Sequence, residues 1–194
     1  MRAIAVSVLC LSIISCKPEV YTPRPRGYAR IDTPQHIYQT FDKPGFPYAF
    51  EYPVYGIISK DTGIKAIKAD NPYWINLDFP TLGGTIYLSY KAIDPTHPLP
   101  TLLDDSHDMS YFLTKRADYM NTPVFHTSNN VHGVLYQVGG NAASTYQFFA
   151  TDSTANFLRG ALYFNTTPNA DSLKPVTDFL QRDIRHMLET LQWK

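Results

Sequence analysis

The stretch YWINLDFPTLGGTIYLSY, residues 73–90, decides the fold of this chain. Apolar side chains recur at every second position on both sides of the turn PTLGG: Tyr73, Ile75, Leu77 and Phe79 before it, and Ile86, Leu88 and Tyr90 after it. A period of two residues is typical of a strand with one buried face, and a short Pro/Gly turn between two such runs predicts a hairpin. The centre of the fold is therefore expected to be an antiparallel sheet.

The same period recurs on both sides of this hairpin. Upstream, a run from Phe46 to Pro53 alternates aromatic and other residues, and its prolines at 47 and 53 predict an edge strand. Downstream, alternating runs span residues 131–139, 144–151 and 157–164, with GGNAA and DSTAN as turns between them. The sheet is therefore expected to hold about six strands.

Two segments change to the helical period. The first has an apolar stripe at Leu102, Met109, Phe112, Leu113, Ala117 and Met120. The second begins at a cap formed by Asp171 or Ser172, has Pro175 in its first turn, and buries Val176, Leu180, Ile184, Met187 and Leu191. The order β-β-β-α-β-β-β-α predicts an α+β fold in which two helices pack on the antiparallel sheet.

The N-terminus has the pattern of a lipoprotein export signal. Arg2 precedes an apolar run over residues 3–14, which is shorter than the roughly 20 residues that a membrane-spanning helix needs. The run ends in Ile13-Ile14-Ser15-Cys16, which is like a lipobox, whereas Cys10 follows the bulky Leu9 and fits less well. We expect a signal peptide at 1–15, lipid attachment at Cys16, a Pro-rich tether at 16–45 and one domain at 46–194.

The tether contains YTPRPRGYARID, residues 21–32. Arg24, Arg26, Tyr28 and Arg30 are planar groups held on a proline-stiffened segment, and such groups are enriched at protein interfaces. We therefore predict these four residues as a partner-binding surface. The alternative is a stiff arm that packs back on its own domain.

Composition restricts the function further. The chain has 17 basic and 17 acidic residues, so it lacks the positive field that nucleic-acid binding requires. Cleavage before Cys16 would remove Cys10, and acylation would occupy Cys16, which excludes disulfides and thiolate-bound metals. No cofactor is predicted, because the sequence has no Walker loop, dinucleotide-binding GxGxxG, GxSxG elbow or HExxH motif.

Dispersed polar residues leave two alternatives open. One is an envelope hydrolase whose site is assembled from His132, Asp152 and Ser144, and the other is a small-ligand-binding module with a deep cleft. Arg159, in NFLRGALYF, places a charge within a mostly apolar strand. Because buried charges are almost always paired, we expect a carboxylate partner for it.

Several long segments of the sequence resemble the gliding motility lipoprotein GldD family of Bacteroidota. They are YTPRPRGYARID, FEYP, WINLDFP, GTIYLSYK, GNAAS, QFFATDS, FLRGALYFN, PNADSLKPV and LQWK. The resemblance implies a non-enzymatic, cofactor-free envelope lipoprotein needed for gliding and for the type IX secretion machinery, with other components of that machinery as partners. The order of elements also resembles the PsbP and Mog1 type of sandwich.

The membrane that carries the lipid is left open by the sequence. A lipid on Cys16 would anchor the protein to a membrane on its periplasmic side. Lys17 differs from the aspartate of a retention signal, which favours the outer membrane over the inner one.

Overall fold

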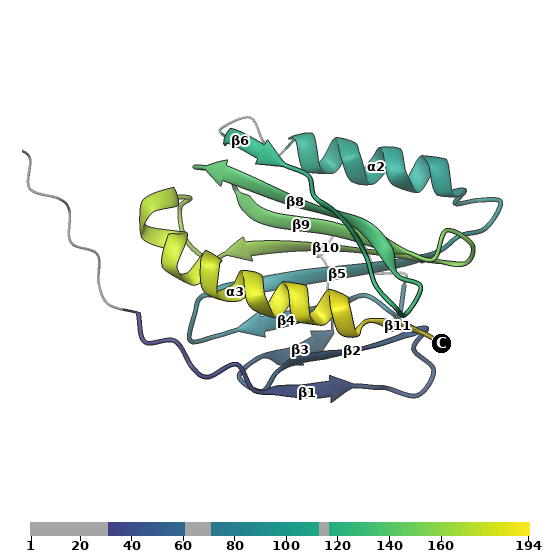
Figure 1. The fold of residues 1–194 in the computed structure, drawn as a ribbon, viewed down its shortest axis with the longest axis horizontal. Coiled ribbons are helices and arrows are strands. Elements are labelled where there is room, and N and C mark those ends of the chain that lie inside the picture. Colours follow the sequence, from purple (N-terminus) through teal and green to yellow (C-terminus); the bar gives the residue numbers. More distant parts are fainter. Residues whose placement is uncertain (1–30, 61–70, 113–116) are drawn as a thin grey trace, which may run out of the picture. The chain divides into compact units, whose positions relative to one another are not determined.

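The structure is a computed structural model that describes residues 31–60, 71–112 and 117–194. These residues form eleven strands and two helices, shown in Figure 1. The strands are β1 (Tyr38–Phe41), β2 (Tyr48–Pro53), β3 (Ile57–Lys60), β4 (Ile75–Phe79), β5 (Gly84–Ala92), β6 (Ala117–Asn121), β7 (Val124–His126), β8 (His132–Gly140), β9 (Ser144–Thr151), β10 (Asn156–Phe164) and β11 (Gln192–Trp193). The helices are α2 (Leu99–Phe112) and α3 (Ala170–Thr190).

A large antiparallel sheet has the strand order β3-β4-β5-β10-β9-β8-β6, and β7 also pairs with β8. The hairpin predicted from residues 73–90 is β4–β5, in which Ile75 lies opposite Leu88 and Leu77 opposite Ile86. The three downstream runs are β8, β9 and β10, close to their predicted bounds. The predicted α+β class is confirmed, with more strands than expected.

The two faces of the large sheet pack against different elements. On β9, Phe148 belongs to the main core with the apolar stripe of α3, while its neighbour Phe149 packs in a second cluster with Leu102 of α2. Consecutive strand residues point to opposite faces, so the two helices cover opposite sides of the sheet. Figure 1 shows α3 lying across the strands and α2 apart from it.

Strand β2 is not an edge strand, and that prediction was wrong. It lies between β1 and β11 in a separate three-stranded sheet, with Phe50 opposite Phe41 and Tyr48 opposite Trp193. Its Tyr48 and Phe50 side chains are fully buried in the main core. The prolines are tolerated because Pro47 precedes the strand and Pro53 ends it.

The N-terminal boundary of the folded part also differs from the expectation. Strand β1 falls within residues 16–45, where a tether was expected, yet it pairs with β2 along its whole length. This strand has only four residues and one buried side chain, Phe41. So short a run carries almost no periodicity, which explains why the sequence did not reveal it.

The first helix ends earlier than its predicted stripe. Helix α2 stops at Phe112, Ala117 and Met120 belong to β6, and Leu113 lies outside the described residues. Met109 and Phe112 are exposed, and the buried face is made instead by Leu102, Ser106 and Ser110. Small serines at this spacing let the helix approach the sheet closely, so the buried face is not the most apolar one.

The last helix follows the prediction except at its start. Its cap is Asn169, whose side-chain oxygen accepts a hydrogen bond from the Ser172 backbone N–H at 3.1 Å, rather than Asp171 or Ser172. Pro175 lies in the second turn. The predicted stripe is buried, and Leu191 completes it just beyond the helix end.

Candidate functional site

The residues with the strongest functional signal in the sequence cannot be placed. Cys16, Arg24, Arg26, Tyr28 and Arg30 all lie outside the described residues. The described chain therefore bears on the other candidates: the polar groups of the hydrolase alternative, the buried charges, and the grooves.

The three residues of the hydrolase alternative do not converge. His132 lies opposite Thr151 at one end of β9, whereas Ser144 begins that strand. Thr151 is seven residue steps along the strand from Ser144, which is roughly 24 Å at 3.4 Å per step. Ser144 is fully buried, and its hydroxyl donates to the backbone carbonyl of Tyr146 at 3.2 Å. It is therefore no nucleophile for His132.

His132 instead contacts a serine that sequence reasoning did not single out. Its Nε2 lies 2.6 Å from the Ser153 hydroxyl oxygen, and Ser153 has a left-handed backbone with φ of 64°. The other ring nitrogen of His132, Nδ1, is buried and has no partner among the described residues. A triad needs a carboxylate at that position to orient the imidazole, so this pair lacks the third member.

The Asp152 side chain forms hydrogen bonds within the turn between β9 and β10. Its Oδ1 accepts hydrogen bonds from the backbone N–H groups of Thr154, Ala155 and Asn156 at 2.8–2.9 Å. Burial by itself would raise the pKa of Asp152, but the backbone hydrogen bonds from these three residues outweigh it and lower the pKa to about 2. The carboxylate therefore acts as a turn cap.

The buried carboxylate of Asp183 in α3 joins the segment around β1 to the core. Its Oδ1 lies 2.7 Å from His36 Nδ1 and accepts a hydrogen bond from the Tyr38 hydroxyl at 3.0 Å, and its Oδ2 accepts one from Tyr55. Burial, together with the charge and the hydrogen bond of Asp183, raises the pKa of Tyr38 to about 12. Both oxygens of this carboxylate have hydrogen-bond partners. Asp183, His36, Tyr38 and Tyr55 together hold β1 against α3, and we call this cluster the Asp183 latch.

Aromatic stacking strengthens this latch. The ring centroids of Tyr38 and His186 are 3.6 Å apart, and those of His36 and Phe179 are 4.2 Å apart. His186 Nε2 also lies 2.7 Å from a carboxylate oxygen of Glu51 in β2. The sequence offered no signal for these contacts, because their partners are more than a hundred residues apart.

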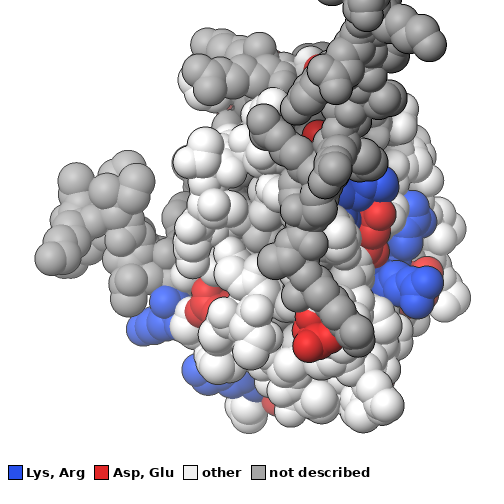
Figure 2. Space-filling view, turned by 90° about the vertical axis from the view of Figure 1, so that its left-hand side faces the viewer, with Lys and Arg blue, Asp and Glu red and all other residues white. Residues whose placement is uncertain are grey.

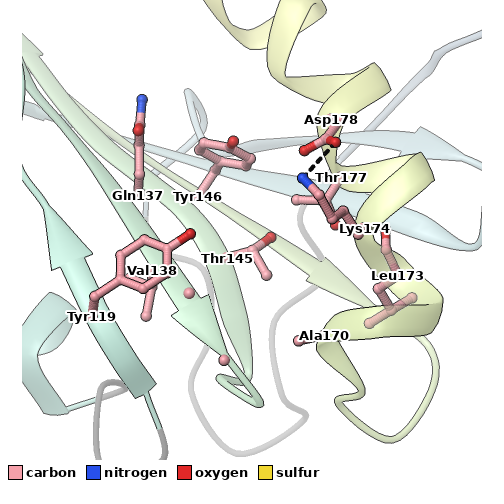
Figure 3. Close-up of a pocket in the computed structure, with 12 residues that line it drawn as sticks. Tyr119, Gln137, Val138, Thr145, Tyr146, Ala170, Leu173, Lys174, Thr177 and Asp178 are labelled. Atoms are coloured by element: carbon pink, nitrogen blue, oxygen red, sulfur yellow. Dashed lines mark hydrogen bonds and ion pairs between the residues drawn. The ribbon is translucent and has the colours of Figure 1, made fainter.

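A groove lies between the first half of α3 and the edge of the large sheet at β6. Figure 3 shows Tyr119 on one side of the groove, Lys174 and Asp178 on the other, and Thr145 between them. Lys174 Nζ donates to Asp178 Oδ2 at 2.8 Å, and this hydrogen bond raises the pKa of Lys174. The pair is an exposed link along one helix face.

Glycine backbone at residues 139 and 140 forms part of the lining of this groove. Tyr119 lies opposite Gly139 in the register of β6 and β8, and a Cβ atom on Gly139 would lie 2.1 Å from the Tyr119 ring. The tyrosine ring therefore covers the glycine, and the pair of glycines at 139 and 140 gives it room. Tyr119 is 60 % exposed, although sequence reasoning did not select it.

The groove suits contact with a side chain better than turnover of a substrate. Its volume is about 130 Å³, and ligand pockets are usually about 300–1,000 Å³. Two potential nucleophiles in its lining, Lys174 and Thr177, are already hydrogen-bonded, to Asp178 and to the backbone carbonyl of Leu173.

The described residues show neither a patch of one charge on the face in Figure 2 nor a cluster of metal-ligating side chains. Figure 2 shows cationic and anionic side chains interspersed on a largely neutral face. Over residues 31–60, 71–112 and 117–194, no group of three His, Cys, Asp or Glu side chains is placed to hold a metal ion. Within the same ranges, neither helix combines the length and the apolar character needed to cross a bilayer.

Comparisons with known proteins connect the chain to one family. A family model described as gliding motility lipoprotein GldD matches residues 18–193. No curated protein matches the chain. Among solved structures, the chain is similar to the solution structure of cyanobacterial PsbP (CyanoP) from Synechocystis sp. PCC 6803, at 13 % identity and a TM-score of 0.47. That match covers 88 % of this chain and 100 % of the other.

Proposed function

The chain belongs to the family of gliding motility lipoprotein GldD, and on this premise we propose that it serves gliding motility and the associated type IX protein secretion machinery. In this role it is a non-catalytic assembly or interaction component of the cell envelope of a Bacteroidota cell. The family match over residues 18–193 is the observation that carries the proposal, because it spans the arm and the folded domain together.

The proposed anchor is a lipid on Cys16, exposed after removal of residues 1–15. More than one acyl chain on a single cysteine gives stable attachment, at about 0.8 kcal/mol for each buried methylene. The protein then faces the periplasm from the inner or the outer membrane, and Lys17 favours the outer one. The tether would lead from Cys16 towards β1. Because β1 begins at Tyr38, the folded part includes residues before the boundary at residue 46 that the sequence indicated.

The proposed partners are other envelope proteins of the gliding and secretion apparatus. We assign their binding to Arg24, Arg26, Tyr28 and Arg30 of the arm. The groove beside Tyr119 is a second candidate surface, because an exposed aromatic ring beside an ion pair offers both apolar and polar contacts. The dispersal of His132, Asp152 and Ser144 supports this reading over the hydrolase alternative.

The proposal is tested by export of a type IX cargo reporter from a strain that lacks this gene. We expect export to fail, and a wild-type copy to restore it. A Cys16→Ala copy should not restore it, and envelope fractionation should find that variant outside the membrane fraction. Cys10→Ala is the matched control and should behave like wild type, because its cysteine lies in the segment that is removed.

Two outcomes contradict the proposal. If the deletion leaves export unchanged, the protein has no part in secretion. If Cys16→Ala restores export fully, the anchor is not needed, and the lipoprotein reading of residues 13–16 is wrong for this function.

A further inference from the structure

Arg159 of β10 has no carboxylate partner among the described residues, although the sequence predicted one. Within the part of the chain that the structure describes, the hydrogen bond that its guanidinium donates runs from Nη2 to the side-chain oxygen of Gln147, at 2.6 Å. Its Nε is buried and has no hydrogen-bond partner there. Burial lowers the pKa of Arg159, while the nearby Tyr163 and Tyr136 oppose that effect. A half-buried cation held only by a neutral amide is unusual, because buried charges are normally paired.

This guanidinium faces a pocket between α2 and the sheet. The pocket has a volume of about 190 Å³, and its walls are mainly apolar, with Trp74, Leu102, Met109 and Phe157 among them. Arg159 and Met109 also line a more open hollow of about 450 Å³ that reaches Phe112 and Tyr163. The shared residues make the two spaces neighbours, so an occupant of the pocket has room to extend along α2.

A second polar group in the same pocket is also unpaired. Ser106 of α2 is 1 % exposed, and its hydroxyl is buried with no hydrogen-bond partner among the described residues. The neighbouring Ser110 differs, because its hydroxyl donates to the backbone carbonyl of Ser106 at 2.8 Å. Leaving a buried hydroxyl unsatisfied is unfavourable, so its presence in a pocket beside a guanidinium that lacks a carboxylate partner among the described residues points to a ligand.

We propose that this pocket binds a small monocarboxylate with an apolar body, whose carboxylate is held by Arg159 and Ser106. The guanidinium offers planar N–H donors that match a carboxylate, and the Ser106 hydroxyl offers another donor. The apolar walls then receive the hydrocarbon part of the ligand, as is usual in small-molecule sites. The inference does not depend on the proposed role in secretion.

The charges around the pocket select the class of anion. Lys91 adds a second cation to the lining and the exposed Asp105 adds one carboxylate, which leaves one net positive charge. Asp108 borders the open hollow, but its side chain is 87 % exposed, and its Oδ1 lies 3.7 Å from His107 Nδ1. A single excess positive charge suits a monoanion better than a doubly charged phosphate, which would also meet Asp105 at close range.

The test is isothermal titration calorimetry on the full-length protein in a non-ionic detergent, with a detergent-only blank subtracted. The probes are hexanoate, the neutral hexanamide of the same shape, and hexyl phosphate. We expect hexanoate to bind saturably, and at least about tenfold more tightly than hexanamide, because a charge-assisted pair to arginine is worth roughly 1.4 kcal/mol or more. Hexyl phosphate should bind more weakly than hexanoate.

Substitution of Arg159 and of a matched cation separates binding from general charge effects. Arg159→Gln should weaken hexanoate at least about tenfold and leave hexanamide unchanged. Arg182→Gln removes an exposed cation from α3 and should change neither probe. Equal affinity of hexanoate and hexanamide, or no saturable binding at all, would overturn the proposal, and tighter binding of hexyl phosphate would overturn the monocarboxylate assignment.

Ser106→Ala keeps the proposal testable if Arg159→Gln fails to fold. This change removes a hydroxyl that the unliganded protein leaves unpaired, so the variant should melt at or above the temperature of the wild type. It should nevertheless bind hexanoate several-fold more weakly. Ser110→Ala is the matched control and should keep the hexanoate affinity. An unchanged affinity in Ser106→Ala would exclude its hydroxyl from the site.

Discussion

At the scale of single residues, the Asp152 carboxylate closes the turn between β9 and β10. It accepts hydrogen bonds from three backbone N–H groups and from the side-chain amide of Asn156, so charge-assisted hydrogen bonds stabilise the turn. The sequence placed Asp152 in a candidate hydrolase site because of its residue type. The structure shows that its acceptor capacity is already used by the turn.

The lowered pKa of Asp152 predicts how stability depends on pH. A carboxyl group whose pKa falls from 3.8 to about 2 on folding stabilises the native state above about pH 4, and this contribution is lost as the pH falls towards about 2. Asp152→Asn should therefore lower the free energy of unfolding by about 1–2 kcal/mol at neutral pH, with allowance for partial solvent screening. The difference from wild type should shrink strongly at about pH 2.5, as measured by urea unfolding.

The exposed Asp104 of α2 provides the control for this pH experiment. Asp104→Asn removes the same formal charge without breaking a turn, and should change stability by less than about 0.5 kcal/mol. If Asp152→Asn lost the same stability at every pH, the ionised turn cap would not be its cause.

At the scale of elements, the Asp183 latch explains why four residues can form a stable strand. Strand β1 is short and mostly exposed, and an isolated pair of short strands is only marginally stable. The carboxylate of Asp183 accepts hydrogen bonds from Tyr38 within β1 and from Tyr55 before β3, and it also contacts His36. Helix α3 thereby holds β1 in place.

Removal of the Asp183 carboxylate should detach β1. Asp183→Ala leaves three half-buried polar groups without their acceptor, so we expect a loss of about 2–3 kcal/mol in the free energy of unfolding. Limited proteolysis should also cut near β1 faster than in wild type. Asp178→Ala on the same helix is the matched control, because it removes only an exposed pair with Lys174 and should leave the stability nearly unchanged. Similar losses in the two variants would contradict the latch.

At the scale of the whole molecule, the sheet separates two environments. One face, with α3 and the small sheet, holds the main apolar core. The other face, with α2, holds a smaller cluster and the pocket of Arg159. The main core and the inferred ligand site therefore lie on opposite faces of the sheet. Substitutions in the pocket can thus alter binding with little effect on the main core.

The arm is expected to act independently of this folded body. Arg24→Ala combined with Arg26→Ala should weaken co-purification of envelope partners and leave the melting temperature unchanged. The double variant Arg182→Ala with Arg185→Ala removes two exposed cations from α3 and serves as the charge-matched control. A fall in the melting temperature of the arm variant would show instead that the arm packs on its own domain.

Local pattern accounts for most of the fold that could be predicted. The β4–β5 hairpin, strands β8 to β10 and the stripe of α3 are long enough for their period to be read directly. Strands β1, β3, β7 and β11 have two to four residues, and so short a run does not distinguish a strand from a loop. Strand β6 has five residues, as β4 does, but it lacks the alternation of buried and half-buried positions that β4 has. Helix α2 was misjudged because serine, rather than a large apolar residue, faces the sheet.

By itself, the sequence determined the α+β class, the antiparallel character of the sheet and, through its long family-specific segments, the family. These properties depend on residues close together in the chain. Only the tertiary structure decided that Asp183 latches β1, that His132 meets Ser153 rather than Ser144, and that Arg159 donates to the Gln147 side chain rather than to a carboxylate. The physical reason is that pairing of polar groups depends on which distant segments the core brings together, and residue type alone does not encode those distances.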